Sequence, residues 1–311
     1  MTAMIDVRHL RKEYGSNVAI ENLTLQIPQG EVFGLIGPNG AGKTTLIRIL
    51  ATLLEPTYGE VYVDGVDALE DPLEVHPRIG YMSDFFALYD NMKVWAYLDH
   101  FARCYGIEAP RREKLIDEAL LLVDLNVRKD AEVKALSRGM RQRLCFAKTL
   151  LHEPKLLLLD EPASGLDPRA RIEFRELIKR LHEMGRTVLI SSHILQEMSD
   201  FCTSIGIFEK GKLLVAGRVE EIVRKLHAGL QLDIEVIDGK DRLLELLSNH
   251  DGVANPAPTS QGARCAWTLG REQLPRLHKA LVAADIPLAA FAVRDDDLED
   301  VYLRISTHQT A

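Results

Sequence analysis

Three short apolar runs alternate along the chain with longer segments in which apolar residues recur at helical spacing. The runs lie in VFGLI at 32–36, KLLLLD at 155–160 and TVLISS at 187–192. Continuous apolar strands separated by helices are typical of a parallel sheet that is covered on both faces. Residues 1–217 are therefore predicted to form one α/β unit with a parallel core sheet.

The segments before the first run follow another pattern. IDVRHLRKEYG and AIENLTLQIPQGE alternate apolar and polar residues, with turn signals between them. Such alternation is typical of an antiparallel sheet with one face in water. We therefore expect an N-terminal antiparallel β subdomain.

The pattern changes again after about Arg218, and residues 218–311 are predicted to form a small accessory domain. LQLDIEVI alternates strictly, DRLLELLSNH is helical, and two weak strands, a helix and the strand PLAAFAVRD follow. The order β-α-β-β-α-β is that of a ferredoxin-like α+β domain. The segment offers no cluster of Cys, His or carboxylates, so we expect an interaction or regulatory role.

Composition and charge limit the kinds of function that the chain can have. The chain has 311 residues, a net charge of −8 and four dispersed cysteines, without a CxxC pair. The acidic balance argues against a nucleic-acid binder, and the cysteines suggest neither a zinc site nor disulfides. No window reaches the roughly 18 apolar residues of a membrane span, and the N-terminus is not a secretory signal. If the protein works at a membrane, a partner must supply the spanning helices.

A phosphate-binding loop follows the first apolar run. GPNGAGKTT at 37–45 satisfies the pattern GxxxxGK[ST] and lies between a predicted strand and a predicted helix. Backbone N–H groups of such a loop converge on phosphates, Lys43 reaches the β- and γ-phosphates, and the Thr44 hydroxyl can ligate Mg²⁺. The predicted nucleotide-binding residues here are Gly37, Pro38, Asn39, Gly40, Ala41, Gly42, Lys43, Thr44 and Thr45.

The second apolar run ends in two acids. In LLLLDEP, Asp160 emerges at the carboxyl end of a buried strand, where α/β sheets place ligands, and Glu161 follows it. We expect Asp160 to hold Mg²⁺ and Glu161 to act as the general base that polarises a water molecule. Together with the phosphate loop, these acids predict an NTPase.

Three further motifs complete a family pattern. LSRGMRQRL at 136–144, ASGLD at 163–167 and SSH at 191–193, in this order, resemble the ATP-binding cassette (ABC) family, specifically the nucleotide-binding subunit of an export-type ABC transporter. The resemblance covers roughly residues 4–217 and implies a P-loop NTPase fold with a helical subdomain at about 85–150. LEDVYL at 298–303 looks like the C-terminal extension of drug-, ion- and lipid-export cassettes.

The resemblance implies roles for five more residues. Tyr14 matches the aromatic residue that stacks on adenine, although an ordinary strand aromatic is the alternative. Ser137 and Gly139 match the signature motif, which faces the γ-phosphate of the ATP held by the other subunit. Asp167 matches the loop that crosses between subunits, and His193 matches a catalytic histidine that contacts the γ-phosphate.

The chain departs from the family pattern at two places. In the signature, Arg138 replaces a small residue and Met140 replaces a glutamine; we expect the site to survive, with Arg138 adding positive charge. Asp84 stands where the family has a glutamine that helps to hold Mg²⁺, and we expect this carboxylate to couple metal to partner. The aromatic segment 85–98 is either a docking surface or a helix that packs Trp95 and Leu98 into its own core.

The leading hypothesis is an ATPase subunit of a membrane transporter. Two copies, or this chain and a related cassette, would enclose two ATP–Mg²⁺ and drive substrate movement, with export favoured, through separate integral membrane subunits. Such a subunit would be peripheral, at the cytoplasmic face of the cell membrane, and would bind no nucleic acid. The alternatives are a soluble non-transport ABC ATPase and a regulatory cassette that binds ATP with little turnover.

Overall fold

The computed structural model describes residues 3–85, 87–194, 198, 200–226 and 230–294. The chain divides into two compact units, Met1–Val219 and Glu220–Ala311, and each is described by itself.

The first unit contains the predicted antiparallel sheet. Its strands are β1 (Ala3–Tyr14), β2 (Asn17–Pro28), β4 (Tyr58–Val63) and β5 (Val66–Asp67), in the order β2-β1-β4-β5. In β2, Leu23, Leu25 and Ile27 are buried while the residues between them are exposed. The alternation seen in the sequence therefore marks the two faces of this sheet.

A six-stranded sheet forms the core. Its order is β10 (Lys212–Arg218), β9 (Ser204–Glu209), β3 (Val32–Ile36), β8 (Thr187–Ser192), β7 (Leu156–Leu159) and β6 (Ile79–Met82). Strands β9 to β6 in this order run parallel, and β10 is an antiparallel edge strand that the sequence pattern did not predict. Every residue of β3, β7 and β8 is buried, as their continuous apolar runs predict.

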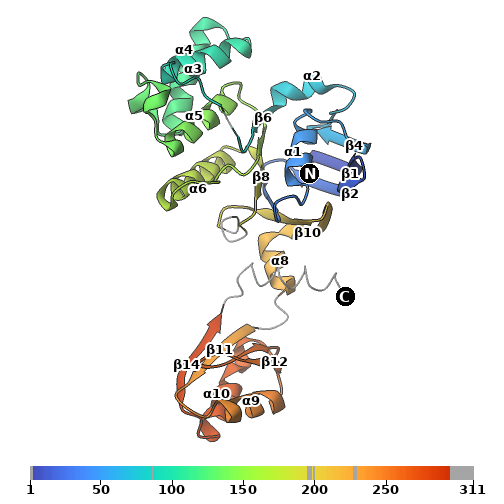
Figure 1. The fold of residues 1–311 in the computed structure, drawn as a ribbon, viewed down its shortest axis with the longest axis vertical. Helices are drawn as coiled ribbons and strands as arrows, with labels where there is room; N and C mark the ends of the chain where they lie inside the picture. Colours follow the sequence, from blue (N-terminus) through green and yellow to red (C-terminus); the bar gives the residue numbers. More distant parts are fainter. Residues whose placement is uncertain (1–2, 86, 195–197, 199, 227–229, 295–311) are drawn as a thin grey trace. The chain divides into compact units, whose positions relative to one another are not determined.

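Three helices gather away from the antiparallel sheet (Figure 1). They are α3 (Val94–Cys104), α4 (Ala109–Leu122) and α5 (Arg138–Leu150), and they correspond to the helical subdomain expected at about 85–150. Further helices in the described part of the unit are α1 (Lys43–Leu50), α2 (Pro72–Val75) and α6 (Pro168–Glu183), with short 3₁₀ turns at His76–Arg78, Asn126–Arg128 and Val133–Ala135.

The aromatic segment before and within α3 divides between core and surface. Leu98 is fully buried, whereas Trp95 is 38% exposed and Phe85 is 86% exposed. Packing into the core therefore holds for Leu98 and only partly for Trp95, and Phe85 stays on the surface.

The second unit has the predicted ferredoxin-like topology. It contains β11 (Leu230–Val236), α9 (Lys240–Asn249), β12 (Val253–Pro258), β13 (Gly262–Trp267), α10 (Leu274–Ala283) and β14 (Leu288–Arg294), with the sheet order β12-β13-β11-β14. A 3₁₀ turn at Arg271–Gln273 precedes α10, and α8 (Val219–Leu226) precedes β11. Its core includes Ile234, Leu247, Trp267 and Leu277. The motif LEDVYL lies outside the described residues.

Across the described parts of both units, no helix is both long enough and apolar enough to cross a bilayer.

Candidate active site

The phosphate loop joins β3 to α1 and packs against neighbouring backbone. A Cβ on Gly37 would lie 2.0 Å from the carbonyl oxygen of Phe208, and one on Gly42 would lie 2.3 Å from that of Ala19. Gly42 also has φ +109°, a conformation that side chains disfavour. The tight curl of the loop thus depends on glycine at both positions.

The first turn of α1 opens onto the loop. No side chain caps this helix, so its N-terminal N–H groups remain available to an anion. Lys43 is only 5% exposed, and its Nζ donates hydrogen bonds to the carbonyl oxygens of Gly37 (2.6 Å) and Pro38 (3.1 Å). The same Nζ lies 3.3 Å from Oε1 of Glu161. A buried ammonium therefore stands where phosphates would arrive.

A cavity of about 510 Å³ contains most of the predicted nucleotide-binding residues. Tyr14, half exposed, stands at this cavity, and Lys12 lies over its ring. The lining comprises Tyr14, Asn17, Val18, Ala19, Asn39, Gly40, Ala41, Gly42, Lys43, Thr44, Thr45, Asp84, Glu161 and Lys210. An aromatic ring and a loop of N–H donors thus share one polar cavity.

The carboxyl ends of β7 and β8 supply the oxygen atoms beside this loop. Oδ1 of Asp160 accepts hydrogen bonds from Thr44 Oγ1 (3.1 Å) and Ser191 Oγ (2.8 Å). Among the residues described, no group of three or more His, Cys, Asp or Glu is placed to hold a metal. A hydroxyl beside one carboxylate still fits Mg²⁺, which is usually bound through one or two carboxylates, waters and substrate phosphates.

Glu161 follows Asp160, and both its side chain and its backbone make polar contacts. Its Oε2 lies 2.8 Å from Nδ1 of His193, and its backbone N–H donates to Oγ of Ser191 at 2.8 Å. Its φ is +46°, in the left-handed region that non-glycine residues rarely adopt. The side chain is 13% exposed. Glu161 is thus a nearly buried carboxylate, fixed beside the cavity.

Asp84 lies in a bend just after β6 and lines the same cavity. Although much of the residue is exposed, partial burial raises the pKa of its carboxyl, and the negative charges of Asp160 and Glu161 raise it further. Arg138 and His193 oppose this shift of the Asp84 pKa. Asp84 therefore adds a third acid to the electrostatics of the site.

The signature residues stand outside the cavity of their own chain. Ser137 is the N-cap of α5, and its hydroxyl accepts the N–H of Met140 at 3.3 Å. Asp167 caps α6 by accepting the N–H of Ala170 at 2.9 Å. Ser137, Gly139 and Asp167 are all absent from the cavity lining. One copy of the chain therefore does not bring these predicted residues to its own phosphate loop.

Arg138 is engaged with the loop that follows Glu161. Its Nη2 donates to the carbonyl oxygen of Ser164 at 3.4 Å, and its guanidinium lies against Gly165. A Cβ on Gly165 would come within 2.3 Å of this group.

Sequence reasoning missed five residues of the site. Asn17, Val18, Ala19 and Lys210 line the cavity, and Ser191 bonds to Oδ1 of Asp160 and to the backbone N–H of Glu161. A hydroxyl at the carboxyl end of a core strand was a usable signal for Ser191, because parallel strands present such residues at one edge. Lys210 carried no comparable signal, since it lies in a turn between β9 and β10.

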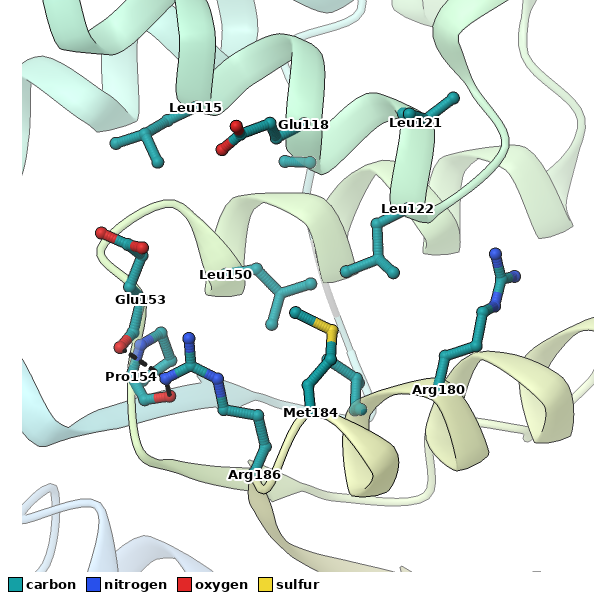
Figure 2. A pocket seen from close by; sticks show the side chains of 12 residues that line it. Leu115, Glu118, Leu121, Leu122, Leu150, Glu153, Pro154, Arg180, Met184 and Arg186 are labelled. Atoms are coloured by element: carbon teal, nitrogen blue, oxygen red, sulfur yellow. Dashed lines mark hydrogen bonds between the residues drawn. The ribbon is translucent and has the colours of Figure 1, made fainter.

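A second cavity has a volume of about 560 Å³. Figure 2 shows the side chains that line it, from α4, the end of α5 and the end of α6. Its walls include Leu122, Leu150 and Met184, and the linings of the two cavities have no described residue in common.

Several known proteins are similar to this chain in sequence or in fold. A family model described as ABC transporter matches residues 20–164. The uncharacterized ABC transporter ATP-binding protein YdbJ of Bacillus subtilis (strain 168) is 32% identical over 98% of this chain and 96% of its own. The Nod factor export ATP-binding protein I of Cupriavidus pinatubonensis is 31% identical over 98% and 91%, respectively. A dimeric structure of the bacterial ABC transporter cassette MJ0796 matches with a TM-score of 0.62 and 26% identity, over 70% of this chain and 99% of that one.

Proposed function

The chain belongs to the ABC transporter family, and on that premise we propose that its cavity binds Mg²⁺–ATP through the residues described above. It is the ATP-binding, ATP-hydrolysing subunit of such a transporter and acts with membrane subunits that move the substrate. The observation that carries the site assignment is the contact of Thr44 with Asp160, next to the Glu161–His193 pair.

Nucleotide binding would rearrange the contacts of Lys43. Its ammonium now bonds to two loop carbonyls and faces Glu161. The β- and γ-phosphates would draw Nζ toward themselves, while N–H groups of the loop and of α1 bind the remaining oxygens. Tyr14, at the same cavity, would stack on the adenine.

The metal would be held by Thr44 Oγ1 and by the carboxylate of Asp160, directly or through water. When bound, Mg²⁺ neutralises the charge that develops on the β- and γ-phosphate oxygens. Asp84, which lines the cavity from the bend after β6, would be a third oxygen ligand or would bind a metal-bound water.

Glu161 would then act as the general base. With Lys43 drawn to the phosphates, Oε1 becomes free to accept a proton from water. The water oxygen bonds to the γ-phosphorus while the bond to the bridging oxygen breaks, which yields ADP and phosphate. His193, hydrogen-bonded to Oε2, would hold the carboxylate in this orientation and contact the γ-phosphate.

A second copy, or a related cassette, would complete the site. Because Ser137 and Gly139 lie outside the cavity of their own chain, we assign them to the γ-phosphate held by the partner, with Asp167 on the connecting loop. A cassette that is 26% identical forms a dimer in its own structure, which supports this arrangement.

Steady-state phosphate release by the purified chain tests the assignment of the site. We expect Mg²⁺-dependent turnover that Lys43→Ala abolishes, because the loop loses the cation that faces the phosphates. Equal phosphate release by wild type and Lys43→Ala would contradict the proposed site.

We place the subunit at the cytoplasmic face of the membrane and favour export as the direction, since one relative is named for Nod factor export. Copurification from a detergent extract tests the partner. Recovery of an integral membrane protein is expected, whereas recovery of ribosomes or nucleic acid would overturn this placement.

A further inference from the structure

One buried hydroxyl connects the two acids of the site. Ser191 lies near the carboxyl end of β8 and is fully buried. Its Oγ donates to Oδ1 of Asp160 and accepts the backbone N–H of Glu161, each at 2.8 Å. The hydroxyl therefore donates its hydrogen to Asp160, the proposed metal ligand, and accepts the N–H of Glu161, the proposed base.

The first bond orients the carboxylate of Asp160. Oδ1 accepts both Thr44 and Ser191, while Oδ2 receives no hydrogen bond from the described residues. Two donors on one oxygen fix the rotation of the carboxyl group and leave the other oxygen for a metal or a metal-bound water.

The second bond supports an unfavourable backbone. Glu161 has φ +46°, in the left-handed region that is unfavourable for a residue with a side chain. The hydrogen bond from its N–H to Ser191 helps to hold this turn, which points the side chain toward Lys43 and His193. The place of the proposed base thus depends on the hydroxyl that also orients Asp160.

We propose that Ser191 is a positioning residue that holds the metal-binding carboxylate of Asp160 and the general base Glu161 in the correct relative positions. The inference rests on the proposed ATPase site and adds to it a dependence of both metal affinity and turnover on one side chain. Alanine would leave the Glu161 N–H without its acceptor and Asp160 with Thr44 as its one remaining donor among the described residues, whereas threonine keeps the hydroxyl.

The test compares Ser191→Ala with Ser191→Thr in the full chain, with Thr187→Val as the matched control. Thr187 is a buried residue of the same strand whose hydroxyl accepts the N–H of Gly30 at 2.9 Å, at the opposite end of the sheet. Mn²⁺ affinity in the presence of ATP, followed by electron paramagnetic resonance, supplies a readout that is independent of turnover. Phosphate release and melting temperature are measured alongside.

For Ser191→Ala, we expect Mn²⁺ affinity and kcat each to fall about tenfold to hundredfold, as is usual when a partner of a metal ligand is removed. Ser191→Thr should restore most of both, and Thr187→Val should change only the melting temperature. If Ser191→Ala does not fold, Ser191→Cys, which keeps a weak donor of similar size, should show a partial loss.

Wild-type Mn²⁺ affinity and kcat in Ser191→Ala would overturn the inference. So would equal losses in the alanine and threonine variants when both melt like the wild type. Absence of metal-dependent turnover in the wild-type chain would instead refute the proposed ATPase function itself, so the two failures can be distinguished.

Discussion

Lys43 and Glu161 form a nearly buried ion pair across the phosphate loop, with 3.3 Å between Nζ and Oε1. The same ammonium is the cation proposed for the phosphates, and the same carboxylate is the proposed base. In the proposed mechanism, ATP binding would separate the pair, and this separation would leave Glu161 available to accept a proton from water.

The Glu161→Gln variant should bind ATP at least as tightly as the wild type yet hydrolyse it very slowly. The amide removes both the base and the charge that competes with phosphate for Lys43. ATP-bound dimers should therefore accumulate, and light scattering would detect them. Normal turnover in this variant would exclude Glu161 from the mechanism.

Asp84→Gln should retain ATP hydrolysis while its Mg²⁺ requirement and its coupling to transport change. The carboxyl of Asp84 lines the cavity, and its pKa is raised by partial burial and by Asp160 and Glu161. Replacing an unfavourable charge by a neutral amide should ease nucleotide binding. ATPase titrations with Mg²⁺, with and without the membrane partner, would show the change; identical curves and identical transport would refute the assigned role.

Lys210→Met should weaken ATP binding by about 1 kcal/mol, and less at high salt, because the lost charge lies at the edge of the cavity. The turn that carries it is joined to the phosphate loop, since the N–H of Gly211 donates to the carbonyl of Ala41 at 2.9 Å. Lys212→Met is the control, because that side chain pairs with Glu21 and does not line the cavity. Calorimetric ATP affinities that fall equally in both variants would contradict a specific contact.

Gly37→Ala should lower the free energy of unfolding by more than about 2 kcal/mol and prevent nucleotide binding, because the new Cβ would meet the backbone oxygen of Phe208. Gly185→Ala is the control that distinguishes a steric clash from backbone strain. Its φ is +76°, but the space around it is open, so a loss of about 1–2 kcal/mol is expected there. Urea unfolding of both variants measures the difference; equal losses would exclude the clash.

The stability of the first unit should fall in mild acid through His152. Its Nε2 donates to the carbonyl of Ile79 at 2.7 Å, and its buried Nδ1 finds no partner among the described residues. Burial lowers the pKa of this imidazole, and the hydrogen bond to Ile79 only partly opposes the shift. Folding therefore favours the neutral ring.

The direction of this pH dependence follows from the proton binding of the folded and unfolded chains. Below its ordinary pKa of about 6.5, the unfolded chain takes up a proton that the folded chain resists. The contribution of His152 is complete above that pH and is lost as the pH falls toward the folded pKa, by up to about 1.4 kcal/mol per pH unit. His152→Gln, which keeps a donor for Ile79, should flatten the decline of melting temperature with acid; parallel curves for variant and wild type would exclude His152 as the cause.

Local and contiguous features of the site could be predicted from sequence. Residues 37–45 form the phosphate loop as one contiguous segment, so its motif can be recognised directly. The burial of β7 and β8 follows from their apolar runs. Features that depend on strand neighbours could not be read in the same way. Ser191 meets Asp160 and Glu161 only because β8 pairs with β7, and Lys210 reaches the cavity only because a hairpin returns to the loop. The antiparallel edge strand β10 was likewise invisible, since its burial is only partial.

The contact between Arg138 and Ser164 gives the chain a mechanical linkage. Through it, the first turn of α5 is fastened to the strand-to-helix segment that begins at Glu161 and ends at Asp167. In the dimer proposed above, this contact would connect the proposed base of one site to Ser137, which we assign to the neighbouring nucleotide. The guanidinium of Arg138 would then couple ATP hydrolysis at one site to the neighbouring site. Gly165 leaves room for this guanidinium because it has no side chain.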